Sequence, residues 1–358
     1  MDGAHILLGT RTMMLDFFRG QAVTIPPMDG ALRPNTALDE AEALVSCEAP
    51  DNLILAKGRL LFSSAGKLMG LNGRRAISSF DASITALGAD DGVLAVGLDT
   101  GRIEIRRQNT SSIDGFNCPV ALAFNGPDDL YVCNGSDQFK PSDWVADLMR
   151  KNAGGSVWHV SLKSGERTCL ARGLAFPHGI AVDTGNNRLI VSESWRHRLI
   201  GIPFTGGAPV PLLAKLPGYP ARLWPSVSGG YLLSLFAPRN RLIEFVLLED
   251  DYRVAMMREV DSRYWIAPSL SASRSFLEPL QSGGVKTMGI HKPWSPSRSY
   301  GLVVELNAGL QPVASYHSRA NGTRHGITSA LDHGGRIVAA SKGGGVILGL
   351  APERRSPA

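Results

Sequence analysis

Three side chains with acid–base or charge-stabilising chemistry stand at the start of short apolar runs. His178 lies in FPHGIAV, Glu48 in CEAPDNLIL and Arg222 in YPARLW. A positioned imidazole can act as a general base on water, a carboxylate can orient that water, and a guanidinium can stabilise developing negative charge. If the fold brings these three side chains together, they predict hydrolysis of a small molecule.

Other side chains near similar positions are candidates for binding the substrate. Two follow Glu48 within the same run, two belong to the later run HGITSALD, and one belongs to GIHKPW. These candidates are Asp51, Asn52, His325, Thr328 and Trp294. A carboxylate that faces an imidazole could also bind one divalent ion, calcium or zinc, with Glu48 and His178 as ligands.

Each candidate also has a structural interpretation. A histidine before a strand is commonly a turn or core residue with hydrogen-bonded ring nitrogens, and this applies to His178 and His325. Arg222 could pair with a buried carboxylate. Trp294 lies in a long insertion, where it could belong to a lid or only pack. The stretch SESWRHR favours a structural cluster over a site.

A repeated unit in the sequence indicates the strands that must position these side chains. An apolar run, a polar turn and a second apolar run recur, and in HGIAVDTGNNRLIVSES the turn TGNN indicates a hairpin. Most units continue with a third apolar run, such as RLIGIPF, and several with a fourth. The units start at Ala49, Ile84, Cys118, His178, Ala221 and about His325. This pattern predicts an all-β, six-bladed β-propeller in which the starts of the inner strands converge on one channel.

The last unit ends at VILGL without a fourth strand. We expect residues 22–25 (AVTI) to supply it and to close a single domain spanning 1–358. Two insertions, about 134–154 and 238–299, separate the second and third strands of blades three and five. The first contains VADLMRK with helical spacing. Loops of this kind share a face with the starts of the inner strands, so both insertions should overhang the channel mouth.

The composition excludes several other classes of protein. The 358 residues are 44% apolar and 19% charged, with 40 glycines and 22 prolines, as expected of a turn-rich globular chain. Basic residues are scattered despite a net charge of +5, which argues against nucleic acid as a partner. No apolar run is long enough for a membrane span, and no secretory signal is recognisable. We expect a cytoplasmic protein with free thiols whose partner is a small organic molecule; the oligomeric state stays open.

At this point the sequence resembles a known family. GLAFPHGIAVDTGNNRLIVSESWRHRLIGI, DWVADLMRKNAGGSVW and YGLVVELNAGLQPVASYHS resemble segments of strictosidine synthase-like proteins. That family belongs to the senescence marker protein/gluconolactonase/paraoxonase-type superfamily of six-bladed propellers. The resemblance covers about residues 45 to 350 and supports the six blades.

Two departures from the family limit the activities that the resemblance implies. Plant strictosidine synthases use a glutamate near the start of the last inner strand, and the position that looks equivalent here is Thr328. A threonine is no base near neutral pH, so Pictet–Spengler condensation is not expected. Calcium-dependent relatives use a Glu, two Asn and an Asp; here Glu48 resembles the Glu, but the others look replaced by Val120, His178 and Ala221, which degrades a calcium site.

Two functions therefore compete. The first is a hydrolase of a small lactone or ester in the channel mouth, with His178 as base, Glu48 orienting water and Arg222 stabilising negative charge. The second is a propeller that binds a small molecule without turnover. A protein-interaction scaffold is a third class, for which the sequence offers no direct support.

Overall fold

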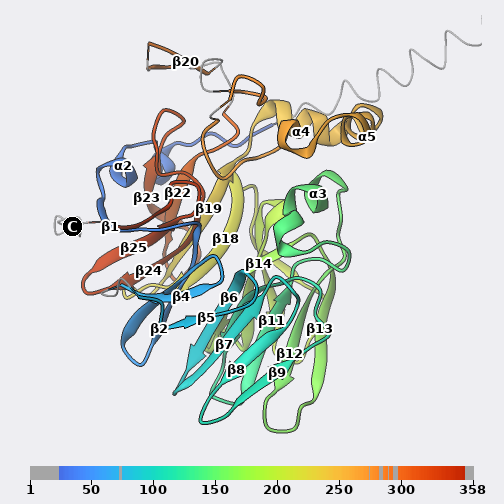
Figure 1. The fold of residues 1–358 in the computed structure, drawn as a ribbon, viewed down its shortest axis with the longest axis vertical. Coiled ribbons are helices and arrows are strands. Elements are labelled where there is room, and N and C mark those ends of the chain that lie inside the picture. The colour runs from blue at the N-terminus through green and yellow to red at the C-terminus, as the bar shows by residue number, and fades with distance from the viewer. Residues whose placement is uncertain are drawn as a thin grey trace, which may run out of the picture.

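The structure is a computed structural model that describes residues 24–71, 75–273, 275–281, 285–288, 290–292 and 297–350. It confirms an all-β protein in which four-stranded antiparallel sheets form six blades of a propeller (Figure 1). Short helices occur mainly in two insertions, and none in the described part of the chain is long and apolar enough to cross a membrane.

The first three blades follow one another along the chain. Blade 1 contains β2 (Pro50–Ala56), β3 (Arg59–Ser64), β4 (Lys67–Gly70) and β5 (Ser78–Ser79). Blade 2 contains β6 (Ile84–Asp90), β7 (Val93–Leu98), β8 (Ile103–Arg106) and β9 (Thr110–Ile113). Blade 3 contains β10 (Pro119–Phe124), β11 (Asp129–Asn134), β12 (Gly155–Ser161) and β13 (Arg167–Leu174).

The other three blades complete the ring. Blade 4 contains β14 (Pro177–Asp183), β15 (Arg188–Glu193), β16 (Arg198–Pro203) and β17 (Val210–Leu213). Blade 5 contains β18 (Gly218–Pro225), β19 (Tyr231–Pro238), β22 (Gly301–Leu306) and β23 (Pro312–Ser318). Blade 6 contains β24 (Ile327–His333), β25 (Arg336–Ser341), β26 (Val346–Leu350) and β1 (Glu42–Ser46).

The ring closes through a strand from the N-terminal part of the chain, but not through the expected residues. Thr24 and Ile25 form no strand, and residues 22–23 lie outside the described residues. The closing strand is β1, whose Glu42 pairs with Gly349 and Ser46 with Val346. The apolar residues of EALVS fit that edge, because the register shifts between Ala43 and Val45 and the neighbours Leu44 and Val45 both pack on the core around Ile347.

Apolar contacts between neighbouring sheets hold the blades together. The innermost strands contact one another in the circular order β2, β6, β10, β14, β18, β24 and back to β2. Between blades 3 and 4, for example, buried Val157 packs in one cluster with Leu189 and Val191. The residues of HGIAVDTGNNRLIV form the predicted hairpin of β14 and β15, with Asn187 at φ 49° in the turn between them.

Both insertions lie where the sequence places them. The first joins β11 to β12 and contains α3 (Trp144–Met149) after a short 3₁₀ turn, η2 (Pro141–Asp143). The second joins β19 to β22 and contains α4 (Arg241–Leu248), α5 (Asp250–Glu259), η5 (Ser262–Tyr264) and the two-residue strands β20 (Lys286–Thr287) and β21 (Ile290–His291). The helices α3, α4 and α5 contribute to one apolar cluster, which joins the two insertions on one face of the ring (Figure 1).

Candidate functional site

Every inner strand has a β-bulge near its start, at the centre of the ring. In β14 the pairing passes from Pro177–Glu193 to Gly179–Ser192 and skips His178. The other inner strands do the same at Asp51 and Asn52, Thr85, Val120, Ala221 and Arg222, and Thr328. A bulged residue leaves the ladder and its side chain is redirected. The bulges therefore explain how unrelated stretches of sequence present side chains to one channel.

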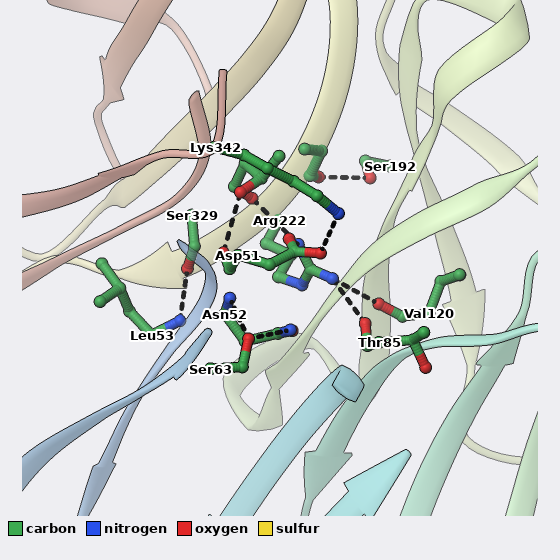
Figure 2. A network of polar contacts seen from close by, with 12 residues as sticks. Asp51, Asn52, Leu53, Ser63, Thr85, Val120, Ser192, Arg222, Ser329 and Lys342 are labelled. Carbon is green, nitrogen blue, oxygen red and sulfur yellow. Dashed lines mark hydrogen bonds and ion pairs between the residues drawn. The ribbon is translucent and has the colours of Figure 1, made fainter. Parts of the chain in front are cut away.

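Arg222 reaches across this channel and joins several blades (Figure 2). From blade 5, its Nη1 donates to Asp51 Oδ1 of blade 1 at 2.7 Å and to the Thr328 carbonyl of blade 6 at 3.4 Å. Its Nη2 donates to the Thr85 carbonyl of blade 2 at 2.7 Å and to the Val120 carbonyl of blade 3 at 3.1 Å. The side chain is only 12% exposed. All four terminal N–H groups are thus directed at protein acceptors, so Arg222 pairs with a buried carboxylate, as its structural interpretation predicts.

Asp51 is the carboxylate at the centre of the site, and it contacts two cations (Figure 2). Lys342 Nζ lies 2.7 Å from Oδ2, while Arg222 occupies Oδ1. Burial opposes ionisation of Asp51, but the charges of Arg222 and Lys342 outweigh it and hold the pKa far below its ordinary value. Asp51 is therefore ionised near neutral pH.

His178 is a neutral imidazole beside these charges. Burial, followed by the charge of Arg222, lowers its pKa from 6.5 to about 3, although the negative charge of Asp51 acts in the opposite direction. The ring makes edge-to-face contacts with Phe176 and Phe236, at centroid distances of 5.3 and 5.5 Å. Its Nδ1 is buried and has no hydrogen-bond partner among the described residues. The residue is half-buried and lines the central pocket, so a ligand or a water molecule can reach the ring.

A pocket of about 270 Å³ opens above this cluster. Both insertions line it, the first through Ser142 and Trp144 and the second through Leu270, as the sequence predicts for loops over the channel mouth. The remaining lining residues combine an apolar wall with a charged floor. They are Asp51, Ser83, Ile84, Thr85, Asp99, Val120, Pro141, Phe176, His178, Arg222, Phe236, Thr328 and Lys342.

Among the other candidates, Thr328 lines the pocket and Asn52 lies beside it. Thr328 is buried and donates its Oγ1–H to the main-chain carbonyl of Asp51 at 2.8 Å. Asn52 is buried too, but its side-chain amide donates to Ser63 Oγ at 3.0 Å, and the residue does not line the pocket. Both side chains therefore help to fix the strand that carries Asp51.

Glu48 and His325 lie away from the pocket. Glu48 is exposed, and its main-chain carbonyl accepts from Ser64. It comes before β2 begins, so the bulge presents Asp51 to His178 in its place. His325 is 1% exposed and contacts Ser299 Oγ through Nδ1 and the Arg319 carbonyl through Nε2, so it joins blade 6 to the second insertion. Trp294 lies outside the described residues.

The residues at the channel do not fit a calcium or zinc site. No group of three or more His, Cys, Asp or Glu side chains is arranged for a metal within the described ranges. Around Asp51 the positive charge comes from Arg222 and Lys342, which occupy both carboxylate oxygens. A divalent ion would have to displace these cations, which repel it. The proposed ligands Glu48 and His178 are not brought together, because Glu48 is exposed and does not line the pocket.

Sequence reasoning missed Lys342 and Asp99. Lys342 follows β25 in SKGGGVI, which reads as an ordinary turn, and Asp99 follows β7. Both lie in loops between the second and third strands of their blades, the same class of loop as the two insertions. Topology alone could therefore have placed them at the channel mouth.

A larger hollow of about 470 Å³ lies between α3 and α4, but its charged side chains already have partners. Arg239 pairs with Glu244 at 2.8 Å and Lys151 with Asp250 at 3.2 Å. Arg196 pairs with Glu193, whose side chain is fully buried. This last pair belongs to SESWRHR, which forms a structural cluster as expected.

Comparisons with known proteins agree with this architecture. The model of the strictosidine synthase family matches residues 122–201, which contain the His178 hairpin. The adipocyte plasma membrane-associated protein of Danio rerio is 26% identical over 113 residues, which are 31% of this chain and 27% of that protein. The protein of the same name from Salmo salar is 22% identical over 215 residues, 59% of this chain and 46% of that protein. The match thus spans less than half the length of either relative.

Two solved structures share the fold. One is a calcium-binding protein, regucalcin, from Agrobacterium tumefaciens str. C58, with a TM-score of 0.53 and 11% identity over 87% of this chain and 93% of that one. The other is a putative gluconolactonase, with a TM-score of 0.53 and 11% identity over 86% of this chain and 90% of that one. The chain therefore has the fold of a six-bladed propeller. The family model that matches residues 122–201 confirms the resemblance to the strictosidine synthase-like family over that stretch.

Proposed function

We propose that the protein hydrolyses a small lactone or ester in the central pocket and needs no metal ion to do so. The observation that carries the proposal is a neutral imidazole, His178, which lines a largely apolar pocket together with Lys342. The likeness to a putative gluconolactonase supports this reaction class. Because the terminal N–H groups of Arg222 are all engaged, the role of stabilising negative charge passes from Arg222 to Lys342.

In the proposed reaction, water gives a proton to Nε2 of His178 while its oxygen adds to the carbonyl carbon of the substrate. The carbonyl oxygen becomes an oxyanion, which the Lys342 ammonium stabilises. The C–O bond to the leaving oxygen then breaks, and the imidazolium returns the proton to that oxygen. The products are a carboxylic acid and an alcohol group, joined in one molecule when the substrate is a lactone.

Binding without turnover is a second candidate, and one observation favours it. Nδ1 of His178 has no acceptor among the described residues, so no carboxylate orients the ring as in a catalytic triad. The lowered pKa of His178, about 3, also makes it a weak base. A pocket with these properties could hold a ligand and leave it unchanged.

The test is a panel of aliphatic lactones, aromatic lactones and aryl esters, assayed before and after treatment of the protein with a chelator. We expect turnover that survives chelation and falls at least about 100-fold in His178→Gln, which is the lower range for loss of a general base. His333→Gln, at the end of β24, is the matched control and should keep full activity. No turnover of any member, or equal turnover in His178→Gln, would refute the hydrolase; loss of activity on chelation would refute its metal independence.

A further inference from the structure

Two cations in the pocket share a single carboxylate. Arg222 and Lys342 each take one oxygen of Asp51, and both contacts are 2.7 Å long. Arg222 uses its remaining terminal N–H groups on main-chain carbonyls, which carry no net charge. With His178 neutral, the cluster at the floor of the pocket carries one net positive charge.

The second carboxylate of the pocket does not neutralise this charge by contact. Asp99 accepts the main-chain N–H of Ser142 at 2.9 Å through Oδ1 and the Ser142 hydroxyl at 3.2 Å through Oδ2. It thus anchors the first insertion at the rim. Lys342 Nζ makes one hydrogen bond among the described residues, to Asp51, and an ammonium group has three N–H donors. Its side chain is 33% exposed, so the other donors are open to a ligand.

The walls above the charge are apolar. Phe176 and Phe236 flank His178, and Trp144 packs against the edge of Phe236 at a centroid distance of 5.3 Å. Leu270 of the second insertion completes this wall. A ligand that fits has a ring or a compact apolar body and one acidic group.

We infer that the pocket binds a small monoanion, a carboxylate on an aromatic or alicyclic body, with the carboxylate on Lys342. The inference takes the location of the site from the proposed function, but it does not require that the bound molecule is hydrolysed. Such a carboxylate has two sources: it is the product of lactone or ester hydrolysis, or a ligand that is held unchanged. In both cases the charge of Lys342 and the apolar wall recognise the same chemistry.

Matched probes that share one apolar body and differ in the charge of the terminal group test the inference by calorimetry. They are 3-phenylpropanoate, its neutral amide 3-phenylpropanamide, and the cation 3-phenylpropylamine. We expect the carboxylate to bind about 10- to 100-fold more tightly than the amide, as for a charge-assisted hydrogen bond, and the amine to bind least. Lys342→Met should remove the preference, Lys342→Arg should restore part of it, and Lys163→Met, in the turn between β12 and β13, should leave it unchanged.

A second arm separates the two sources and keeps the inference distinct from the proposed function. Dihydrocoumarin is a neutral aromatic lactone whose hydrolysis gives 3-(2-hydroxyphenyl)propanoate, so it becomes a member of the binding series. Turnover of the lactone together with inhibition by this product identifies the carboxylate as a product. Selective binding of the carboxylate without turnover of the lactone identifies it as a retained ligand and refutes the proposed hydrolase activity. Equal affinity of the wild-type protein for carboxylate and amide, or a preference that survives in Lys342→Met, overturns the inference whether or not the lactone is hydrolysed.

Discussion

Replacing Arg222 by methionine tests the geometry on which the site depends. Methionine keeps much of the length of the side chain but removes the donors to Asp51 and to the carbonyls of Thr85, Val120 and Thr328. Removing one partner of a buried ion pair typically costs about 3–5 kcal/mol, because the other charge stays buried. Lys342 still contacts Asp51, so we expect the lower part of this range, about 3 kcal/mol.

That loss is a large part of the roughly 5–15 kcal/mol by which domains are stable. It should be visible as a lower midpoint of urea unfolding and as a melting temperature reduced by roughly 4 °C. The matched control is Arg102→Met, because Arg102 is 34% exposed and pairs with Asp81 and Glu104 at the surface. Surface pairs contribute about 0–1 kcal/mol, so the control should unfold close to wild type.

A double-mutant cycle isolates the ion pair from the carbonyl contacts. Asp51→Asn alone leaves Arg222 and Lys342 without a counter-charge, whereas Arg222→Met/Asp51→Asn removes both members of the pair. We expect the double variant to be more stable than the sum of the two single losses predicts, by about 1–3 kcal/mol. A cost below about 1 kcal/mol for Arg222→Met, or strictly additive losses, would refute the view that Arg222 joins the blades.

The other predictions concern His178 and the second insertion. The pKa of His178 is lower in the folded protein than in the unfolded chain, so below pH 6.5 the unfolded state binds the extra proton and the free energy of unfolding falls as the pH drops towards 3, by at most about 1.4 kcal/mol per pH unit. Urea unfolding of His178→Gln between pH 6.5 and 4.5 should show a shallower fall than wild type. Parallel curves for the two proteins would contradict the lowered pKa. A Cβ at Gly343 would lie 1.8 Å from the main-chain oxygen of Leu270, so Gly343→Ala should move the insertion away from the pocket and weaken carboxylate binding several-fold by calorimetry, whereas Gly185→Ala, in an open turn, should not.

The sequence predicts the framework well because its signal is repeated. Alternating apolar runs separated by turns such as TGNN specify strands and hairpins, and their recurrence specifies blades. The same reasoning brings His178, Arg222 and Thr328 to one channel, and the structure places them there.

Individual side chains are harder to place, because a bulge inserts residues that the alternation does not reveal. Glu48 lies just before β2 and Asp51 is the second residue of that strand. Only the bulge in β2 decides that Asp51 faces the channel. The longer turn before β24 similarly leaves His325 in the blade–insertion contact and presents Thr328 instead. Lys342 is missed because a lysine beside three glycines has no chemical signature of its own.

The pairing of β1 with β26 has a consequence for how the protein is made. Glu42 and Gly349 are among the earliest and latest of the described residues to leave the ribosome, yet they are neighbours in the finished sheet. Such contacts raise the contact order, and the entropy of closing so long a loop must be overcome before the last blade gains its outer strand. We therefore expect a nascent chain to keep an open seam until β26 has been synthesised, and chaperones to be needed most at that seam.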